Sequence, residues 1–113
     1  MAVSEKALIE RSPEEGFAVV RFGTDSLQTS GIKSGDTQIT SIPTKVYWLT
    51  VSDTAALAIE LNNSIGGGGT DKWGVDLPAD GYGHFIFDPP LPFSAGVYLD
   101  VSTVTCKVTI GYM

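Results

Sequence analysis

The only histidine of the chain, His84, lies four residues from Asp80 and four from Asp88. A Ser/His/Asp system needs a nucleophile in a strained, recognisable setting, and the sequence contains no GxSxG elbow. On a strand, residues four apart share a face but lie about 13 Å from each other, which is too far for a direct histidine–carboxylate hydrogen bond. We therefore expect His84 to be a half-exposed strand histidine, and we expect no enzymatic activity.

Four consecutive glycines, residues 66–69, precede Thr70, Asp71 and Lys72. Phosphate-binding loops have the spacing GxGxxG or GxxxxGK[ST] and present backbone N–H groups at the start of a helix. Neither spacing occurs here, and no helical pattern follows the glycines. The run is interpreted as a flexible hairpin or loop tip.

Four aspartates, Asp71, Asp76, Asp80 and Asp88, are dense enough to raise the question of a calcium site, because hard cations bind several converging oxygens. Their spacing does not match the EF-hand pattern, so we assign no metal and no other cofactor. The single cysteine, Cys106, excludes an intrachain disulfide and a zinc site built from several thiols. Its place in an apolar alternation predicts a buried, small hydrophobic residue.

The net charge of the chain disfavours some classes of binding partner. Thirteen acidic and seven basic residues give a net charge of −6, and the basic residues form no cluster. This balance disfavours nucleic acid and anionic membrane surfaces as direct partners. The N-terminus lacks the pattern of a signal peptide, and the longest apolar run, residues 55–59, is far shorter than a membrane span. We expect a protein that is made in a cytoplasm.

The elements that position these residues are predicted to be strands. Thirteen glycines and six prolines supply many turn-formers, and turn signals fall at residues 31–35, 62–64 and 78–81. The composition and the strand spacing predict an all-β protein, an antiparallel β-sandwich or jelly roll of about eight short strands. Alternating patterns mark the expected strands at residues 17–22, 36–42, 45–52, 71–77 and 82–88.

Residues 45–52 form the expected central strand, because β-branched and aromatic residues fill both of its faces. Strict alternation places Tyr47, Leu49 and Val51 on one side and Val46 and Trp48 on the other. The segment 53–61 fits either a helix capped by Asp53 or a strand, and the alternation of its larger side chains favours the strand.

The last third of the chain contains the clearest alternation. After a bend at residues 89–93, Val97, Leu99 and Val101 share one predicted face, and the same pattern continues at its end in Val104, Cys106, Val108, Ile110 and Tyr112. One apolar and one polar face indicate an antiparallel sheet that covers a core on one side. Residues 17–113 are expected to form a single β-sandwich domain, preceded by an N-terminal arm, residues 1–16.

Candidate contact residues come from the arm and from aromatic side chains. Leu8 and Ile9 are apolar residues in an otherwise charged arm, and Trp73, Tyr82 and Tyr98 fall off the main core face by alternation. Aromatic residues are favoured anchors in interfaces. The alternative for these aromatics is packing on the second face of the sandwich.

Several segments together resemble small β-sandwich virion proteins of tailed phages, most closely the head decoration or cement proteins. The resemblance covers about residues 45–113 and rests on KVYWLTVS at 45–52, NN at 62–63, FDPPLPF at 87–93, GVYLDV at 96–101 and VTCKVTIGYM at 104–113. It implies a structural protein on the capsid surface of the virion, synthesised in the host cytoplasm. The partner would be the major capsid protein, and a homotrimer at capsid three-fold positions is one implied arrangement.

In that reading the protein bridges neighbouring capsid subunits and stabilises the shell through many modest interfaces. The residues that we expect to make contact are Leu8, Ile9, Trp73 and Tyr82. A second reading is a tail-associated or lectin-like module that binds carbohydrate through Trp73, Tyr82 and nearby Asp and Asn residues. The two differ because the second predicts sugar-dependent binding by the isolated domain.

Overall fold

The computed structural model describes residues 27–113, and within them it contains eight strands and no helix. The expected all-β fold is confirmed. The expected arm, residues 1–16, with Leu8 and Ile9, and the expected strand over residues 17–22 lie outside the described residues. The strands are β1 (Gln28–Thr29), β2 (Thr37–Gln38), β3 (Thr44–Ser52), β4 (Leu57–Asn63), β5 (Thr70–Leu77), β6 (Tyr82–Phe93), β7 (Val97–Val101) and β8 (Lys107–Tyr112).

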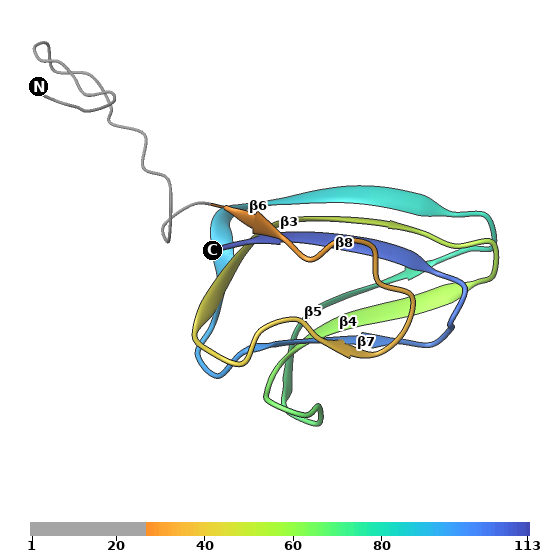
Figure 1. Ribbon diagram of the computed structural model, residues 1–113. Coiled ribbons are helices and arrows are strands. Elements are labelled where there is room, and N and C mark those ends of the chain that lie inside the picture. The colour runs from red at the N-terminus through yellow and green to blue at the C-terminus, as the bar shows by residue number, and fades with distance from the viewer. Residues whose placement is uncertain (1–26) are drawn as a thin grey trace, which may run out of the picture.

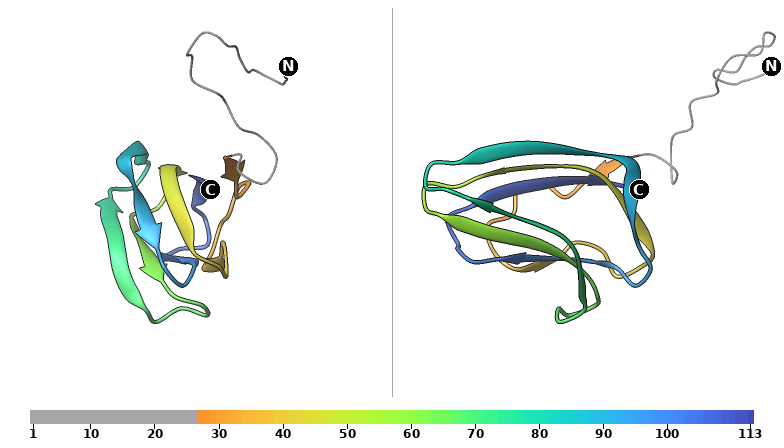
Figure 2. Two further views of the ribbon diagram at one scale, coloured as in Figure 1. Left: turned by 90° about the vertical axis from the view of Figure 1, so that its left-hand side faces the viewer. Right: turned by 180° about the vertical axis from the view of Figure 1, so that it is seen from behind.

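Two antiparallel sheets of four strands face each other (Figures 1 and 2). Sheet A has the order β1-β8-β3-β6, and sheet B has the order β2-β7-β4-β5. The pairs β1·β8, β2·β7, β3·β6 and β4·β5 show that the chain is arranged as one long antiparallel hairpin rolled into two layers. This is the strand order of an eight-stranded jelly roll, which answers the question that the sequence left open.

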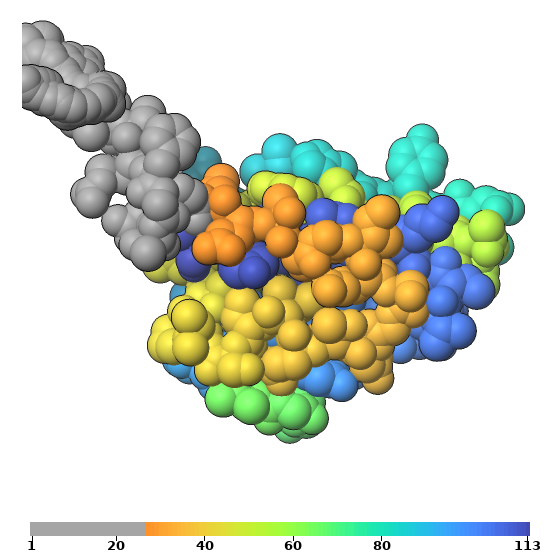
Figure 3. Space-filling model, in the orientation of Figure 1, coloured from red at the N-terminus to blue at the C-terminus, as the bar shows by residue number. Residues whose placement is uncertain are grey.

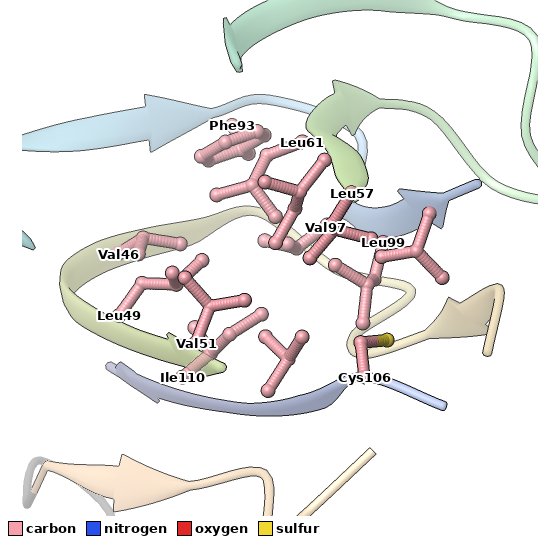
Figure 4. Close-up of a cluster of buried hydrophobic side chains, with 13 residues drawn as sticks. Val46, Leu49, Val51, Leu57, Leu61, Phe93, Val97, Leu99, Cys106 and Ile110 are labelled. Carbon is pink, nitrogen blue, oxygen red and sulfur yellow. The ribbon is translucent and has the colours of Figure 1, made fainter. Parts of the chain in front are cut away.

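The core lies between the two sheets and is almost entirely aliphatic (Figure 4). Alternation along β4 turns Leu57, Ile59 and Leu61 inward, so the strand interpretation of segment 53–61 is confirmed. Phe93 fills the space near the end of β6. The buried hydrophobic residues are Val46, Leu49, Val51, Leu57, Ile59, Leu61, Phe93, Val97, Leu99, Val101, Cys106, Val108 and Ile110.

Strand β3 departs from strict alternation, and this corrects the predicted faces. Its pairing with both β6 and β8 shifts register between Val46 and Trp48. A bulge adds one residue to a strand and changes the side on which the following residues lie. Val46 therefore joins Leu49 on the core side, whereas Trp48 points to the outside of sheet A.

The alternation of the last third spans two sheets instead of one. Strand β7 ends at Val101 in sheet B and β8 begins at Lys107 in sheet A, so the loop between them crosses from one layer to the other. The prediction that Val104 continues the apolar face is wrong, because this residue lies in that loop and is 79% exposed. Cys106 is fully buried, as predicted.

The proline bend at residues 89–93 is part of strand β6, which pairs with β3 on both sides of the bulge. Strand β6 is an edge strand of sheet A with one unpaired side, and its residues 87–90 have no partner on β3, so proline is accommodated there. This explains how Pro89, Pro90 and Pro92 fit within a strand.

None of the residues from 27 to 113 belongs to a helix able to cross a membrane.

Candidate functional site

His84 lies on the outward face of β6 and is exposed, in agreement with a strand histidine. Its ring lies next to the indole of Trp48, with 6.2 Å between the ring centroids and 44° between the planes. Asp88 follows on the same strand, and Asp80 lies in the turn before it. His84 thus lies beside an aromatic ring.

The four aspartates considered for calcium are spread over β5, the following turn and β6. Between residues 27 and 113, no group of three or more His, Cys, Asp or Glu residues is placed to hold a metal ion. Asp71 instead accepts a hydrogen bond from the side-chain amide of Asn62 on the neighbouring strand.

The glycine run forms the loop between β4 and β5, and the strand β5 follows it. Gln38 secures the start of this loop. Its Oε1 accepts from Gly66 N at 2.5 Å, while its Nε2 donates to Ser64 O at 3.0 Å and to Val97 O at 3.2 Å. The ring of Tyr98 stands against Gly67. These contacts fit a loop tip held at its base.

The two aromatic anchors expected within the described residues have different surroundings. Trp73 is half-buried and packs edge-on against Phe85 and Phe87, with centroid distances of 5.1 and 5.5 Å. It therefore joins sheet B to sheet A at the β5 and β6 side of the sandwich. Tyr82, in contrast, is 82% exposed at the start of β6.

The outward side chains of β3, β6 and β8 form a continuous surface, which we call the outer face of sheet A. Strand register places these residues in three rows across the sheet. The rows are Tyr82, Ser52 and Lys107; His84, Thr50 and Thr109; and Ile86, Trp48 and Gly111.

Trp48 lies against the backbone of β8 because its neighbour there is a glycine. A Cβ atom on Gly111 would overlap the indole ring at Nε1 and Cε2. The indole therefore covers Gly111, which is buried, and it contributes to a depression of about 730 Å³. The depression is lined by Leu27, Tyr47, Trp48, Thr50, His84, Ile86, Phe87, Asp88, Pro90 and Thr109.

Of this surface the sequence predicts Tyr82 as a contact residue, but not Trp48 or Ile86. Alternation correctly places Trp48 on the opposite side from Leu49 and Val51, but the bulge hides that the buried Val46 lies on the other side from Trp48. The useful signal was that residues 45–52 are apolar on both sides, because a strand covered on one face only would have a polar second face.

The outer face of sheet B has the opposite chemistry. Glu60 on β4 lies opposite Asp100 on β7, with Asp71 and Asp76 on the adjacent strand β5. The Asp71 carboxylate is the largest cause of a raised pKa at Glu60, followed by desolvation and by Asp100 and Asp76. Desolvation, then Asp36 and Asp71, raise the pKa of Asp100. The outer face of sheet B is thus acidic, whereas that of sheet A combines Tyr82, Ile86 and Trp48 with mostly uncharged polar side chains.

Asp53 organises the loops at the end of the sandwich opposite the C-terminus. Its carboxylate accepts hydrogen bonds from Thr103 Oγ1 at 2.5 Å, Thr105 Oγ1 at 2.6 Å and Ala55 N at 2.9 Å. These bonds lower its pKa, with the one from Thr103 as the largest cause. Instead of capping a helix, Asp53 joins the loop after β3 to the loop before β8.

These observations define an all-β antiparallel jelly roll with a candidate contact surface on the outer face of sheet A. Comparisons of the chain with protein families, with curated proteins and with solved structures found no match.

Proposed function

We propose that this chain is a structural virion protein that decorates a tailed-phage capsid and stabilises it by bridging capsid subunits. The observation that carries the proposal is the outer face of sheet A, where Tyr82 is 82% exposed at one end and Ile86, opposite Trp48, is 71% exposed two rows away. Exposed apolar and aromatic side chains gathered on one face of a small domain are typical of protein contact sites. The jelly roll adds support by analogy, since viral capsid proteins and lectins use this architecture.

In the proposed arrangement the Tyr82 end of the outer face of sheet A contacts the major capsid protein. The acidic outer face of sheet B then points away from the shell, where its negative charge favours solubility of the particle. Trp73 supports the contact strand β6 from inside through Phe85 and Phe87. The homotrimer and the contacts of Leu8 and Ile9 stay predictions from the resemblance.

The proposal is tested by determining which proteins are present in purified virions. Mass spectrometry of purified virions of the parent phage should detect this protein in many copies, and the purified protein should bind particles made without it. Particles that lack the protein, together with no binding on addition, would contradict the proposal.

The second candidate function is carbohydrate binding, favoured by the position of Trp48. An indole lying on a sheet, next to the polar side chains of His84, Thr50 and Thr109, offers a surface on which a sugar ring can stack. This moves the carbohydrate site from Trp73 to Trp48. The test is a glycan array with the purified protein, in which binding that disappears in Trp48→Ala would favour this function over capsid decoration.

A further inference from the structure

Each sheet ends in two edge strands, and within residues 27–113 no further strand pairs with their outer sides. Three of these four edges are protected against pairing with another chain. Strands β1 and β2 are two residues long, and the segment that joins them, orange to yellow in Figure 3, covers their side of the sandwich. Strand β6 contains three prolines. Short edge strands and prolines both prevent the addition of a further strand.

Strand β5 is the fourth edge, and most of it is open. It is eight residues long, contains no proline and lies at the outside of sheet B (Figure 2). Its pairing with β4 shifts register between Asp71 and Trp73, so Lys72 falls at a bulge, whereas residues 73–77 pair regularly. Bulges and lysines discourage edge pairing. The open edge is therefore the stretch of residues 73–77, which reads WGVDL.

The hydrogen bonds of β4 show how the backbone of β5 is oriented. The backbone of Ala58 is directed to the β7 side, since its carbonyl accepts from Ser102 N at 3.0 Å and its N–H donates to Ser102 Oγ at 2.9 Å. Backbone groups alternate in direction along an antiparallel strand. Those of the next residue, Ile59, are therefore directed to its partner on β5, which is Val75.

The same alternation along β5 defines the groups at the open edge. Because Val75 bonds to β4, Gly74 and Asp76 direct their N–H and C=O groups away from β4, to the open side. The side chains of Trp73, Val75 and Leu77 pack against the core and are only half-buried. An added antiparallel strand would therefore meet both backbone hydrogen-bonding groups and a partly exposed apolar row.

The stretch 73–77 is complementary to itself. When two copies pair antiparallel about Val75, Gly74 lies opposite Asp76 of the other copy, and Trp73 lies opposite Leu77. The Gly74 and Asp76 pairs then form four backbone hydrogen bonds, and the apolar side chains of both copies share the inner side. A shift by one residue would mix the two faces, and a shift by two would either oppose Asp76 to Asp76 or include the bulge. This match of the stretch to itself favours a second copy as the added strand.

We propose that two copies of this chain associate through β5, paired antiparallel about a two-fold axis at Val75, so that the two B sheets form one continuous sheet. An interface of this kind closes on itself and gives a dimer. The axis is perpendicular to the sheet, so the outer faces of sheet A of both copies point to the same side. Under the proposed function, the dimer would present two contact surfaces to one shell, as bridging requires. The dimer itself does not depend on that function.

A disulfide across the two-fold axis tests this register. Val75 would face Val75 of the other copy as a non-hydrogen-bonded pair, with about 4.5 Å between the Cα atoms, which lies within the range of disulfides. In a Cys106→Ala background, mild oxidation of Val75→Cys should link most of the protein into dimers. Val104→Cys is the control, because this residue is 79% exposed and would cross-link more readily if random collisions were the cause. A yield from Val75→Cys no higher than that from Val104→Cys would overturn the proposal.

Sedimentation equilibrium gives a readout that needs no added cysteine. The unchanged protein should be a dimer, and high salt should strengthen the association, because the acidic outer faces of the two B sheets become neighbours. A monomer of the unchanged protein, or the homotrimer that the resemblance implies, would overturn the proposal. Binding to particles is measured separately, so its failure would contradict the proposed function alone.

Substitutions at Asp76 test whether the open edge forms the interface. Asp76→Pro removes an N–H that points to the open side and no bond to β4, so this variant should be a monomer with an unchanged circular dichroism spectrum. Asp76→Asn keeps the N–H and should stay dimeric. A folded Asp76→Pro variant that is still a dimer would overturn the proposal.

Discussion

Glu60 on β4 lies directly opposite Asp100 on β7, so two carboxylates occupy neighbouring backbone positions on the outer face of sheet B. Like charges directly opposite each other in a sheet are destabilising. The pKa of each carboxyl is raised, for Glu60 mainly by Asp71 and for Asp100 mainly by desolvation. Folding therefore favours the neutral form of both groups.

The first prediction is that Glu60→Gln and Asp100→Asn each stabilise the protein at pH 7. A carboxyl with a raised folded pKa contributes most below its ordinary pKa, and this contribution is lost as the pH rises through the folded pKa. The gain should thus disappear below the ordinary values of 4.5 for Glu60 and 3.8 for Asp100. Urea denaturation at several pH values measures the gain in free energy of unfolding of each variant.

Two further results of the urea experiment show whether charge repulsion causes the gain in stability. The double variant should gain less than the sum of the two single gains, because Glu60 and Asp100 repel each other. High salt should reduce the gain by screening. Asp88→Asn on β6 serves as the charge-matched control, and an equal stabilisation by this change would attribute the effect to net charge alone.

The second prediction concerns Asp53, whose lowered pKa has the opposite consequence. Its hydrogen bonds with Thr103 and Thr105 contribute stability above the ordinary pKa of 3.8, and this contribution is lost as the pH falls through the lower folded pKa. Asp53→Asn should therefore lower the denaturation midpoint at pH 7 and should lower it less in strong acid. Asp80→Asn, in the adjacent turn, is the control. If the midpoint fell by the same amount at pH 7 and in strong acid, the charge of Asp53 would not contribute to stability.

The third prediction is that Gly111→Ala displaces Trp48. The added methyl group would overlap the indole, and overpacking of this kind costs about 1–3 kcal/mol. A shift in Trp48 emission in a Trp73→Phe background should accompany the loss of stability. Gly35→Ala is the control, because no atom lies within 4 Å of the added carbon. Unchanged Trp48 emission in Gly111→Ala would show that the glycine does not position the indole.

The fourth prediction is that Cys106 is unreactive in the folded protein. It is fully buried, and desolvation is the main cause of its raised thiol pKa. Since the thiolate is the reactive form, a disulfide reagent should modify Cys106 only at the rate of unfolding. In Cys106→Ala, the exposed thiol of Val104→Cys should react at once. Rapid modification of Cys106 in native buffer would disprove its burial.

Much of the core could be predicted from the sequence because alternation reports burial directly. Leu57, Ile59 and Leu61 show this, since their period of two outweighed the helix propensity of the three alanines in residues 53–61. The apolar residues on β7 and β8 were found for the same reason. Alternation could not separate the two sheets, because Val104 continues the pattern through a loop that crosses between them.

The candidate contact surface could be predicted only in part. Tyr82 was identified because β6 alternates regularly from its first residue. Trp48 was not, because strict alternation put it on the same face as Val46, whereas the bulge between them leaves Val46 in the core and Trp48 outside. Trp73 was expected at a surface, but its burial depends on Phe85 and Phe87 of the other sheet, which are contacts that local sequence does not encode.

The central claim, that the outer face of sheet A binds the capsid, is tested most directly by comparing Tyr82→Asp with Val104→Asp. Both residues are exposed to a similar degree, 82% and 79%, but only Tyr82 lies on this face. Each purified variant is added to particles that lack the protein, and the bound copies are counted by quantitative mass spectrometry. The account predicts that Tyr82→Asp loses most of its binding, while Val104→Asp binds like the unchanged protein. Full binding by Tyr82→Asp would contradict it.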